Sequence, residues 1–480
     1  MQNFVIHVLI IIMNSTVKKE KTKKITAIIL AGGKGTRMNS PLPKVLHPVG
    51  GKPMIVRVIE ACRQAGVEDV RIVIGHGGTL VRTVVTPYGV ECFPQAQQLG
   101  TADAVKSAQL DTLEGDVIIL NGDHPLIEAE DLKQFIENFR SQSANVALVT
   151  CELKKPKDFG RVIRHQGSLR AIVEAKDASV ETLKIREVNT GIYIAQADVL
   201  QDYIPRIDNK NLKGEYYLTD LISLAVEDQL KLIPILSSPK VAFGVNTQLE
   251  LARANMIVNR RKVKRLLDAG VLVLDPTHTY VEDDVIVQSG AVLYPGVYLR
   301  GKTSVGPFTA IEPNCYVVDS EIGESVVVRA NSYIEKTVIK ARASIGPFAR
   351  LRPETEIGEE AHVGNFVEMK KVKFGNKSKA GHLTYLGDAE VGTDTNIGCG
   401  TITCNYAVDK KKYKTKIGSH VFVGSDTQFV APIQIGDHAV IGSGSTITKD
   451  VPEKALAVAR GKQFVKENYV KTQGESETKE

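Results

Sequence analysis

Aliphatic residues recur every six positions through the second half of the chain. An α-helix repeats every 3.6 residues and a half-buried strand every two, so neither gives this spacing. A parallel β-helix does, because each coil has three six-residue sides and each side turns one aliphatic side chain inward. Glycine often follows the aliphatic residue, and we expect it to supply the tight corners. The periodic residues are Val281, Val287, Leu293, Leu299, Val305, Ile311, Val317, then Ile345, Leu351, Ile357, Val363, and later Ile417, Val423, Phe429, Ile435, Ile441 and Ile447.

The first half follows a different pattern, in which short aliphatic runs alternate with helix-length segments from Ile25 to about Asn246. This alternation is typical of an α/β domain with a largely parallel sheet, where ligands bind beyond the carboxyl ends of the strands. A charged segment at 249–269 has basic residues in its later turns and predicts a connecting helix. The predicted strands are ITAIIL, VRIVIG, DVIIL and NVALVT, and the predicted helices include 54–65 and 130–140.

Composition narrows the class of protein. The chain has 480 residues, too many for one ordinary core, and its net charge of +6 is modest and includes lysines near both ends. We read those lysines as solvated tails and expect no nucleic-acid partner. Six cysteines without a Cys-x-x-Cys pair argue against a disulfide framework or a zinc ribbon, and they favour a reducing, cytoplasmic location. The apolar run at 4–13 is shorter than the roughly 20 residues of a membrane span, so we expect none.

The stretch LAGGKGTRM, residues 30–38, follows the first predicted strand. It satisfies neither the Walker loop nor the dinucleotide fingerprint, yet its glycines allow backbone amides to fold around phosphate oxygens. Arg37 and Lys44 add cations that suit a leaving pyrophosphate. The motif by itself leaves open a plain glycine turn beside two surface cations. In NGDHPL, Asp123 is either a helix cap or a magnesium ligand.

These motifs resemble the signature of the sugar-phosphate nucleotidyltransferases. LAGGKGTRM with the later PK, QAQQLGTADA and NGDHPL correspond to that family's phosphate, uracil and metal segments, and FGRV, IVEAKDA, EVNTGIY, KGEYYLTD and FGVN extend the match. Joined to a β-helix, the chain from Ile25 to about Arg460 resembles the bacterial family of bifunctional N-acetylglucosamine-1-phosphate uridylyltransferases and glucosamine-1-phosphate N-acetyltransferases. The resemblance implies a Rossmann-like nucleotidyltransferase domain, a connecting helix and a left-handed parallel β-helix that forms a homotrimer.

For the first half, the resemblance implies uridylyl transfer from UTP to N-acetylglucosamine-1-phosphate. The sugar phosphate attacks the α-phosphorus and pyrophosphate leaves, so positioning and charge neutralisation by Arg37, Lys44 and Mg²⁺ carry the reaction. Asp123 and Asn246 are the implied metal ligands. The residues implied around UTP and the sugar are Leu30, Gly32, Gly33, Lys44, Gln95, Gly100, Thr101, Asn121, Gly160, Glu174, Asn189 and Asn246, with Gln95 on the uracil and Gly160, Glu174 and Asn189 on the sugar.

A β-helix can be only a scaffold, so a function in the second half must come from departures from the repeat. The largest departure lies between Val363 and Ile417 and contains His382. The resemblance implies acetyl transfer from acetyl-CoA to glucosamine-1-phosphate, with His382 as the general base that keeps the amine neutral and Glu368 as its orienting partner. The implied sugar-phosphate residues are Arg352, Lys370, Tyr385, Asn396 and Asn405, and the implied acetyl-CoA residues are Cys399, Asn405, Tyr406, Ser425, Ser443 and Arg460.

Two departures from that family bear on the second site. Cys399 stands where alanine is common, and we expect contact there through the backbone. The segment NYAVDKKKYKT is one residue longer than usual, so the choice among Lys410, Lys411 and Lys412 for the sugar phosphate stays open.

The expected domains are a disordered extension at 1–24 with Met13 as a candidate start, a uridylyltransferase domain at 25–248, a linker helix at 249–270, an acetyltransferase β-helix at 271–462 and a disordered tail at 463–480. Three alternatives compete with this interpretation. The first is a single-activity nucleotidyltransferase with a noncatalytic, oligomerising β-helix. The second is a zinc β-helix using His362, His382, His420 or His438, and the third is a trimeric scaffold.

Overall fold

The computed structural model of the chain describes residues 23–467 and 469–470, so most of the expected N-terminal extension and the end of the expected tail lie outside the described residues. The chain divides into two compact units between Val258 and Asn259, and each is described by itself. Within the described ranges, no helix combines the length and the apolar character needed to cross a membrane.

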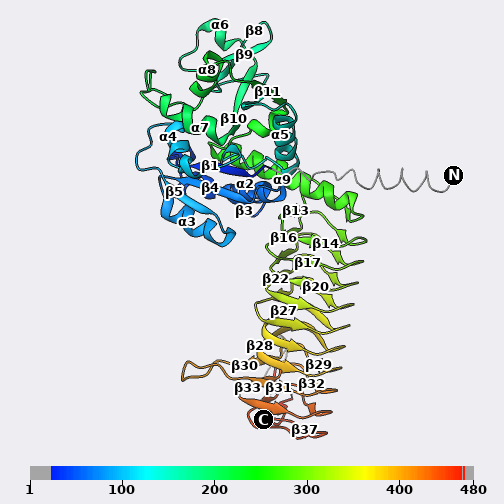
Figure 1. Ribbon diagram of the computed structural model, residues 1–480. Helices are drawn as coiled ribbons and strands as arrows, with labels where there is room; N and C mark the ends of the chain where they lie inside the picture. The colour runs from blue at the N-terminus through cyan, green and yellow to red at the C-terminus, as the bar shows by residue number, and fades with distance from the viewer. Residues whose placement is uncertain (1–22, 468, 471–480) are drawn as a thin grey trace, which may run out of the picture. The chain divides into compact units, whose positions relative to one another are not determined.

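The first unit is built on a nine-stranded sheet with the order β11-β7-β10-β6-β1-β4-β5, to which β8 and β9 are added beside β10 (Figure 1). β1 pairs in parallel with β4 and β6, whereas β10 runs antiparallel to β6 and β7. All four predicted strands are confirmed, as β1, β4, β6 and β7. The strands are β1 (Ile25–Ala31), β4 (Asp69–Ile74), β5 (Glu91–Pro94), β6 (Asp116–Asn121), β7 (Val146–Glu152), β8 (Arg161–His165), β9 (Ser168–Val173), β10 (Glu187–Gln196) and β11 (Leu232–Ser237), with the short pair β2 (Pro48–Val49) and β3 (Lys52–Pro53).

Successive residues of a strand point to opposite faces, so each face of this sheet has its own core. Ile29 packs with the helices of one face and Ile28 with those of the other. α5 has its N-terminal turn fixed by a capping box between Glu128 and Asp131. The helices are α2 (Met54–Gln64), α3 (Gly78–Val85), α4 (Thr101–Lys106), α5 (Ala129–Ser141), α6 (Val180–Leu183), α7 (Ala197–Tyr203) and α8 (Asp220–Glu227).

The predicted connecting helix is α9 (Gln248–Asp268). Ala254 and Val258, from its first half, are buried with Met38 in a core cluster of the first unit. Val263 and Leu266, from its second half, are buried in the core of the second unit. The helix therefore contributes apolar side chains to two cores.

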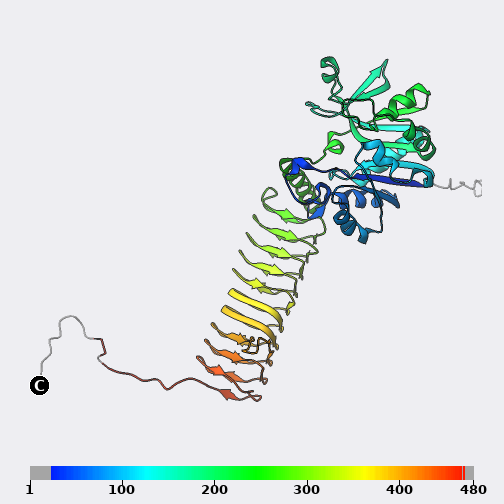
Figure 2. The same ribbon diagram turned by 90° about the vertical axis from the view of Figure 1, so that its left-hand side faces the viewer.

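The second unit is a parallel β-helix whose strands run from β12 (Leu272–Val273) to β37 (Leu456–Ala457) in one 26-stranded sheet (Figure 2). Most strands pair with the third strand along the chain, so three sides make one coil. Every predicted aliphatic position is at most 8% exposed, which confirms the six-residue period. The strands that carry the site are β25 (Arg350–Leu351), β27 (His362–Phe374), β28 (Lys379–Val391), β29 (Asn396–Ile397), β30 (Ile402–Cys404), β31 (Thr415–Ile417), β32 (Phe422–Val423), β33 (Gln428–Val430), β34 (Ile433–Ile435) and β35 (Val440–Ile441).

The expectation that glycine supplies the corners is correct only in part. Gly296 and Gly346 have positive φ, but many corners use other residues in the left-handed region, including Asn314 at φ 60° and His420 at φ 58°. Gly398 serves another purpose, because a Cβ there would lie 2.6 Å from the backbone carbon of Gly424 in the next coil. Much of the glycine in the repeat therefore permits coils to approach one another closely.

Candidate active sites

A cavity of about 260 Å³ opens in the first unit where β1 and β6 end. Most of the residues expected around UTP line it, which places the glycine loop at the carboxyl edge of the sheet as predicted. Gln98 and Glu215 also line it; they lie within the motifs QAQQLGTADA and KGEYYLTD, but sequence reasoning did not single them out. The lining residues are Leu30, Ala31, Gly32, Gly33, Lys44, Val45, Gln95, Gln98, Gly100, Thr101, Ala104, Asn121, Asp123 and Glu215.

Lys44 connects the two expected metal ligands. Its ammonium forms an ion pair with the carboxylate of Asp123 and donates a hydrogen bond to Oδ1 of Asn246 at 3.1 Å. Burial by itself would raise the pKa of Asp123, but the charges of Lys44 and His124 outweigh it and lower that pKa. Two hard oxygens therefore converge on one cation. That donor set fits a magnesium ion, which prefers carboxylate and amide oxygens and completes its shell with water and phosphate.

Gln95 is held in one orientation at the cavity wall. Its Nε2 donates to the carboxylate of Asp103 at 2.7 Å and to the carbonyl of Gly100 at 3.1 Å. Gly100 has φ 130°, and a Cβ there would collide with the backbone of Tyr216. Thr101 accepts a hydrogen bond from the backbone N–H of Leu218 at 2.9 Å. Because the Gln95 amide nitrogen is occupied, its carbonyl oxygen is the group available to a ligand.

The three residues expected around the sugar lie together outside the cavity lining. The backbone N–H of Asn189 donates to the carbonyl of Gly160 at 2.9 Å, and a Cβ on Gly160 would lie 3.4 Å from Oε1 of Glu174. Burial raises the pKa of Glu174. A Cβ on Gly191 would meet the amide of Asn121, a cavity residue, so this cluster borders the cavity.

Arg37 is placed less favourably than Lys44. It lies in the 3-10 turn η1 (Thr36–Met38), is exposed, and is not among the residues that line the cavity.

In the β-helix, His382 and several expected acetyl-CoA residues occupy the same corner in successive coils. The register aligns Asn365 with His382, and it continues through β29, β32 and β35. Cys399, Ser425 and Ser443 each lie two residues beyond the paired strand positions in those coils. The coils are tied by backbone hydrogen bonds at this corner, such as Asp426 N–H to the carbonyl of Cys399 at 2.7 Å.

Arg460 extends this corner ladder. Its guanidinium donates to the carbonyl of Ser443 at 2.9 Å. The expected acetyl-CoA residues from Cys399 to Arg460 thus form a stripe that begins beside His382, except for Asn405 and Tyr406, which lie elsewhere.

The partner of His382 is not the one expected. Nδ1 of His382 lies 2.6 Å from Oδ1 of Asn365. Glu368 instead accepts a hydrogen bond from Arg352 at 2.8 Å. The expectation that Glu368 orients His382 is therefore wrong, because β27 places Glu368 three residues past Asn365, opposite Tyr385.

A cluster of cations lies on the side of the coil that follows the His382 corner. The pKa of Lys370 is lowered, first by the adjacent Lys412 and then by Arg352. Of the three candidate lysines in the long segment, Lys412 is thus the one beside Lys370. Three cations held this close repel one another, so the arrangement favours an anion.

Tyr385 and Asn405 border this cluster. Gly387 is paired with Lys370 in the register, and a Cβ on Gly387 would lie 2.7 Å from Nδ2 of Asn405 and would also meet the hydroxyl of Tyr385. Tyr406 is 62% exposed and forms an isolated β-bridge with Lys412, at the base of the hairpin that projects between β30 and β31 (Figure 1).

Asn396 is not brought to this cluster. It lies on β29, where the register pairs it with Lys379 and Phe422. In chain order, this side of the coil comes before the corner that holds His382. Lys370 and Tyr385 come after that corner in their coils.

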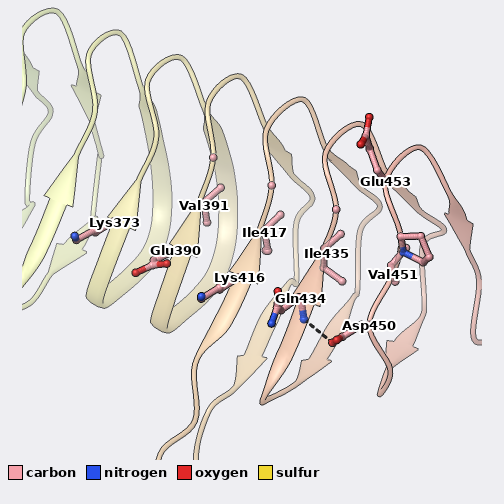
Figure 3. Close-up of a pocket in the computed structure, with 14 residues that line it drawn as sticks. Lys373, Glu390, Val391, Lys416, Ile417, Gln434, Ile435, Asp450, Val451 and Glu453 are labelled. Atoms are coloured by element: carbon pink, nitrogen blue, oxygen red, sulfur yellow. Dashed lines mark hydrogen bonds between the residues drawn. The ribbon is translucent and has the colours of Figure 1, made fainter.

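A larger hollow of about 720 Å³ lies on the third side of the coils (Figure 3). Its charged residues alternate along successive coils, from Lys373 through Glu390 to Lys416, and Asp450 accepts from the backbone N–H of Gln434 at 2.8 Å. None of the expected site residues lines it.

The histidines of the zinc alternative are less scattered than the sequence indicates. The rings of His420 and His438 stack with centroids 4.8 Å apart, because they hold the same corner in adjacent coils. Even so, no group of three or more potential metal-binding His, Cys, Asp or Glu side chains occurs within 23–467 and 469–470.

Comparisons with known proteins agree with this division of the chain. The MobA-like NTP transferase domain matches residues 27–183. The GMPPB C-terminal domain matches residues 281–379, and six repeats of the bacterial transferase hexapeptide match residues 414–449.

Curated relatives match over nearly the whole length. The bifunctional protein GlmU of Bdellovibrio bacteriovorus is 63% identical over 455 residues, which cover 95% of this chain and 99% of the relative. GlmU of Carboxydothermus hydrogenoformans is 44% identical, covering 92% and 99%, and that of Trichlorobacter lovleyi is 43% identical, covering 92% and 97%. Coverage of both halves at this identity leads to one conclusion: the chain belongs to the family of the bifunctional protein GlmU.

Proposed function

We propose that the two reactions of this bifunctional uridylyltransferase and acetyltransferase take place at the two clusters described above, one in each unit. The uridylyltransferase domain then spans 25–248 and the acetyltransferase domain 271–462, with 249–270 as linker. The observation that carries the proposal is that each unit holds its own set of convergent polar groups. One set gathers around Lys44 and Asp123, and the other surrounds His382 and Lys370.

In the first domain, the glycine loop holds the phosphates of UTP through its backbone amides. Lys44 neutralises charge on the phosphates, and Gln95 offers its amide oxygen to the uracil. Asp123 and Asn246 hold Mg²⁺, which supplies charge neutralisation when bound. Gly160, Glu174 and Asn189 hold N-acetylglucosamine-1-phosphate, whose phosphate oxygen attacks the α-phosphorus so that pyrophosphate leaves. No protein nucleophile is needed, since positioning and charge carry this chemistry.

Arg37 is proposed as a second cation for the pyrophosphate. Its exposure on η1 leaves its side chain free to reach a ligand in the cavity mouth, which supports this role.

In the second domain, His382 accepts the proton of the glucosamine amine as that nitrogen attacks the thioester carbon of acetyl-CoA. Ser425, two coils along the same corner, donates to the developing oxyanion. The acetyl-CoA extends along the corner over Cys399, Ser443 and Arg460, and Asn405 and Tyr406 contact it from outside this stripe.

The phosphate of glucosamine-1-phosphate is held by the cluster of Arg352, Lys370 and Lys412, with Tyr385 against the sugar. The mutual repulsion that lowers the pKa of Lys370 supports this assignment, because a bound dianion relieves it. The same contact favours Lys412 over Lys410 and Lys411.

Asn396 supports a homotrimer. It is implied at the sugar, yet it lies on another side of the coil from Lys370 and Tyr385 in its own chain. A neighbouring copy that presents this side would complete the site, as a cyclic assembly allows.

Two further proposals concern the cellular location of the enzyme and the single-activity alternative. We propose a cytoplasmic enzyme, supported by free thiols at all six cysteines. A single-activity enzyme with an inert β-helix is the weaker alternative, because such a coil has no need of three clustered cations.

The direct test incubates the purified protein with glucosamine-1-phosphate, acetyl-CoA, UTP and Mg²⁺ and identifies products by mass spectrometry. The proposal expects coenzyme A, pyrophosphate and UDP-N-acetylglucosamine. Product formation only when N-acetylglucosamine-1-phosphate replaces glucosamine-1-phosphate would support the single-activity alternative.

A further inference from the structure

The contact between Asn365 and His382 joins two neighbouring coils of the β-helix. Asn365 lies on β27 and His382 on β28, and the two residues are directly opposite in the parallel register. The 2.6 Å separation between Oδ1 of Asn365 and Nδ1 of His382 is that of a strong hydrogen bond. Asn365 is half-buried, whereas His382 is exposed. The fixed partner is therefore the asparagine, and the exposed imidazole is the group it can orient.

The chemistry of an amide decides what this contact does. The Oδ1 of asparagine only accepts hydrogen bonds, so it holds the proton on Nδ1 of the imidazole. The neutral ring then carries its lone pair on Nε2, the nitrogen that points away from Asn365. A general base needs that lone pair, and the opposite tautomer would present an N–H to the substrate amine.

From this geometry we infer that Asn365 is a positioning residue for acetyl transfer: it fixes the tautomer and ring orientation of His382. The inference rests on the proposed role of His382 as general base and adds the residue that keeps the base in its working form. Among residues 23–467 and 469–470, the imidazole of His382 has no hydrogen bond to any other side chain, and Glu368, the carboxylate nearest in sequence to Asn365, is engaged by Arg352.

An uncharged partner is suited to this place. A carboxylate beside Nδ1 would favour the imidazolium, which cannot accept a proton. Asparagine supplies the orienting bond without that opposing charge.

The step that this arrangement serves is balanced. The amine nitrogen forms a bond to the thioester carbonyl carbon, and its proton passes to Nε2 of His382. The carbon–sulfur bond then breaks, and the departing thiolate of coenzyme A takes the proton from Nε2. Throughout, Nδ1 keeps its proton, held by Asn365.

The test compares Asn365→Ala and Asn365→Asp in the full-length enzyme. Asn365→Ala should lower the kcat of acetyl transfer by about tenfold or more, a part of the usual contribution of a general base, and leave both KM values within about twofold. Asn365→Asp should restore much of the kcat at high pH. Its acid limb should move to higher pH, since a carboxylate beside Nδ1–H favours the imidazolium.

A spectroscopic readout separates positioning from general structural damage. In ¹⁵N-labelled enzyme, the ring nitrogens of His382 should report the Nδ1–H tautomer in the parent, and this preference should be lost in Asn365→Ala. The matched control is Asn376→Ala, which removes an asparagine whose Oδ1 accepts from the backbone N–H of Glu359 at 2.9 Å. It should lower thermal stability and leave the kcat, pH profile and tautomer of His382 unchanged.

Circular dichroism verifies that each variant is folded. An Asn365→Ala enzyme with parental kcat, or with a reduced kcat but the parental tautomer, would overturn the inference. His382→Ala distinguishes the two levels of the argument. If that variant retains acetyl transfer, the proposed base is wrong, whereas its inactivity together with full activity of Asn365→Ala rejects only the role of Asn365.

Discussion

The ammonium of Lys44 lies against the carboxylate of Asp123 at the end of the cavity where the glycine loop and β6 meet. Lys44→Ala removes a cation from the proposed phosphate site and leaves the Asp123 carboxylate without its partner. We expect uridylyl transfer, measured as pyrophosphate release, to fall roughly 100-fold, the usual effect of losing one charge-stabilising donor. Lys52→Ala breaks a comparable ion pair with Glu60 away from the cavity and is the matched control. Equal losses in both variants would contradict the assignment.

The cation cluster on the β-helix predicts a graded effect within one run of lysines. Lys412→Ala should raise the KM for glucosamine-1-phosphate by roughly tenfold, as expected for the loss of one charge-assisted hydrogen bond. Lys410→Ala and Lys411→Ala, neighbours in the same hairpin, should change it less than about twofold. Steady-state kinetics of acetyl transfer measures these KM values. A larger effect at Lys410 than at Lys412 would contradict the assignment of the phosphate contact to Lys412.

Asp220, at the start of α8, predicts a pH-dependent stability. Burial raises the pKa of Asp220 to about 6, and the charges of Asp208 and Asp177 add to the shift. The native state therefore binds this proton more tightly than the unfolded chain does, so the stability contributed at low pH is lost as the pH rises toward 6. Asp220→Asn removes that loss.

Urea unfolding should show Asp220→Asn more stable than the parent by roughly 1 kcal/mol at pH 7.5, a figure reduced for the partial exposure of the carboxyl. The gain should shrink as the pH falls below 6 and vanish below about pH 3, where the carboxyl is protonated in both states. The same gain at both pH values would mean that titration of Asp220 is not its cause.

Two glycines in adjacent coils predict opposite tolerances to alanine. A Cβ on Gly364 would collide with the carbonyl oxygen of Gly381, whereas a Cβ on Gly381 would have no heavy atom within 4 Å. Gly364→Ala should lower the free energy of unfolding by about 1–3 kcal/mol, as overpacking does. Gly381→Ala should change it by less than about 0.5 kcal/mol. Similar melting temperatures for the two variants would show that coil spacing does not constrain Gly364.

Much of the fold could be predicted from the sequence because buried residues recur in it at regular positions. The six-residue period marks a series of buried aliphatic positions between Val281 and Ile447, and the runs of aliphatic residues mark β1, β4, β6 and β7. The antiparallel direction of β10 could not be predicted, because the topology of the sheet, and not the local sequence, determines which strands β10 pairs with.

The site residues also divide into those that the sequence could predict and those that it could not. Motifs identified the loop residues around Lys44, since a glycine loop and its cations are neighbours in sequence or in a known pattern. Asn365 and Lys412 make contacts between distant segments: Asn365 meets His382 across 17 positions, a pairing that only the register reveals. Glu368 was misassigned for that reason, as the sequence cannot show that Arg352 holds it.

The two reactions are proposed to take place at two independent catalytic centres in one chain. The most direct measurement assays both half-reactions separately in His382→Ala and Asp123→Ala, with folding of each variant confirmed by circular dichroism. We predict that His382→Ala loses acetyl transfer and keeps uridylyl transfer near the parental rate, and that Asp123→Ala shows the reverse. Loss of both activities in either folded variant, or of neither, would contradict it.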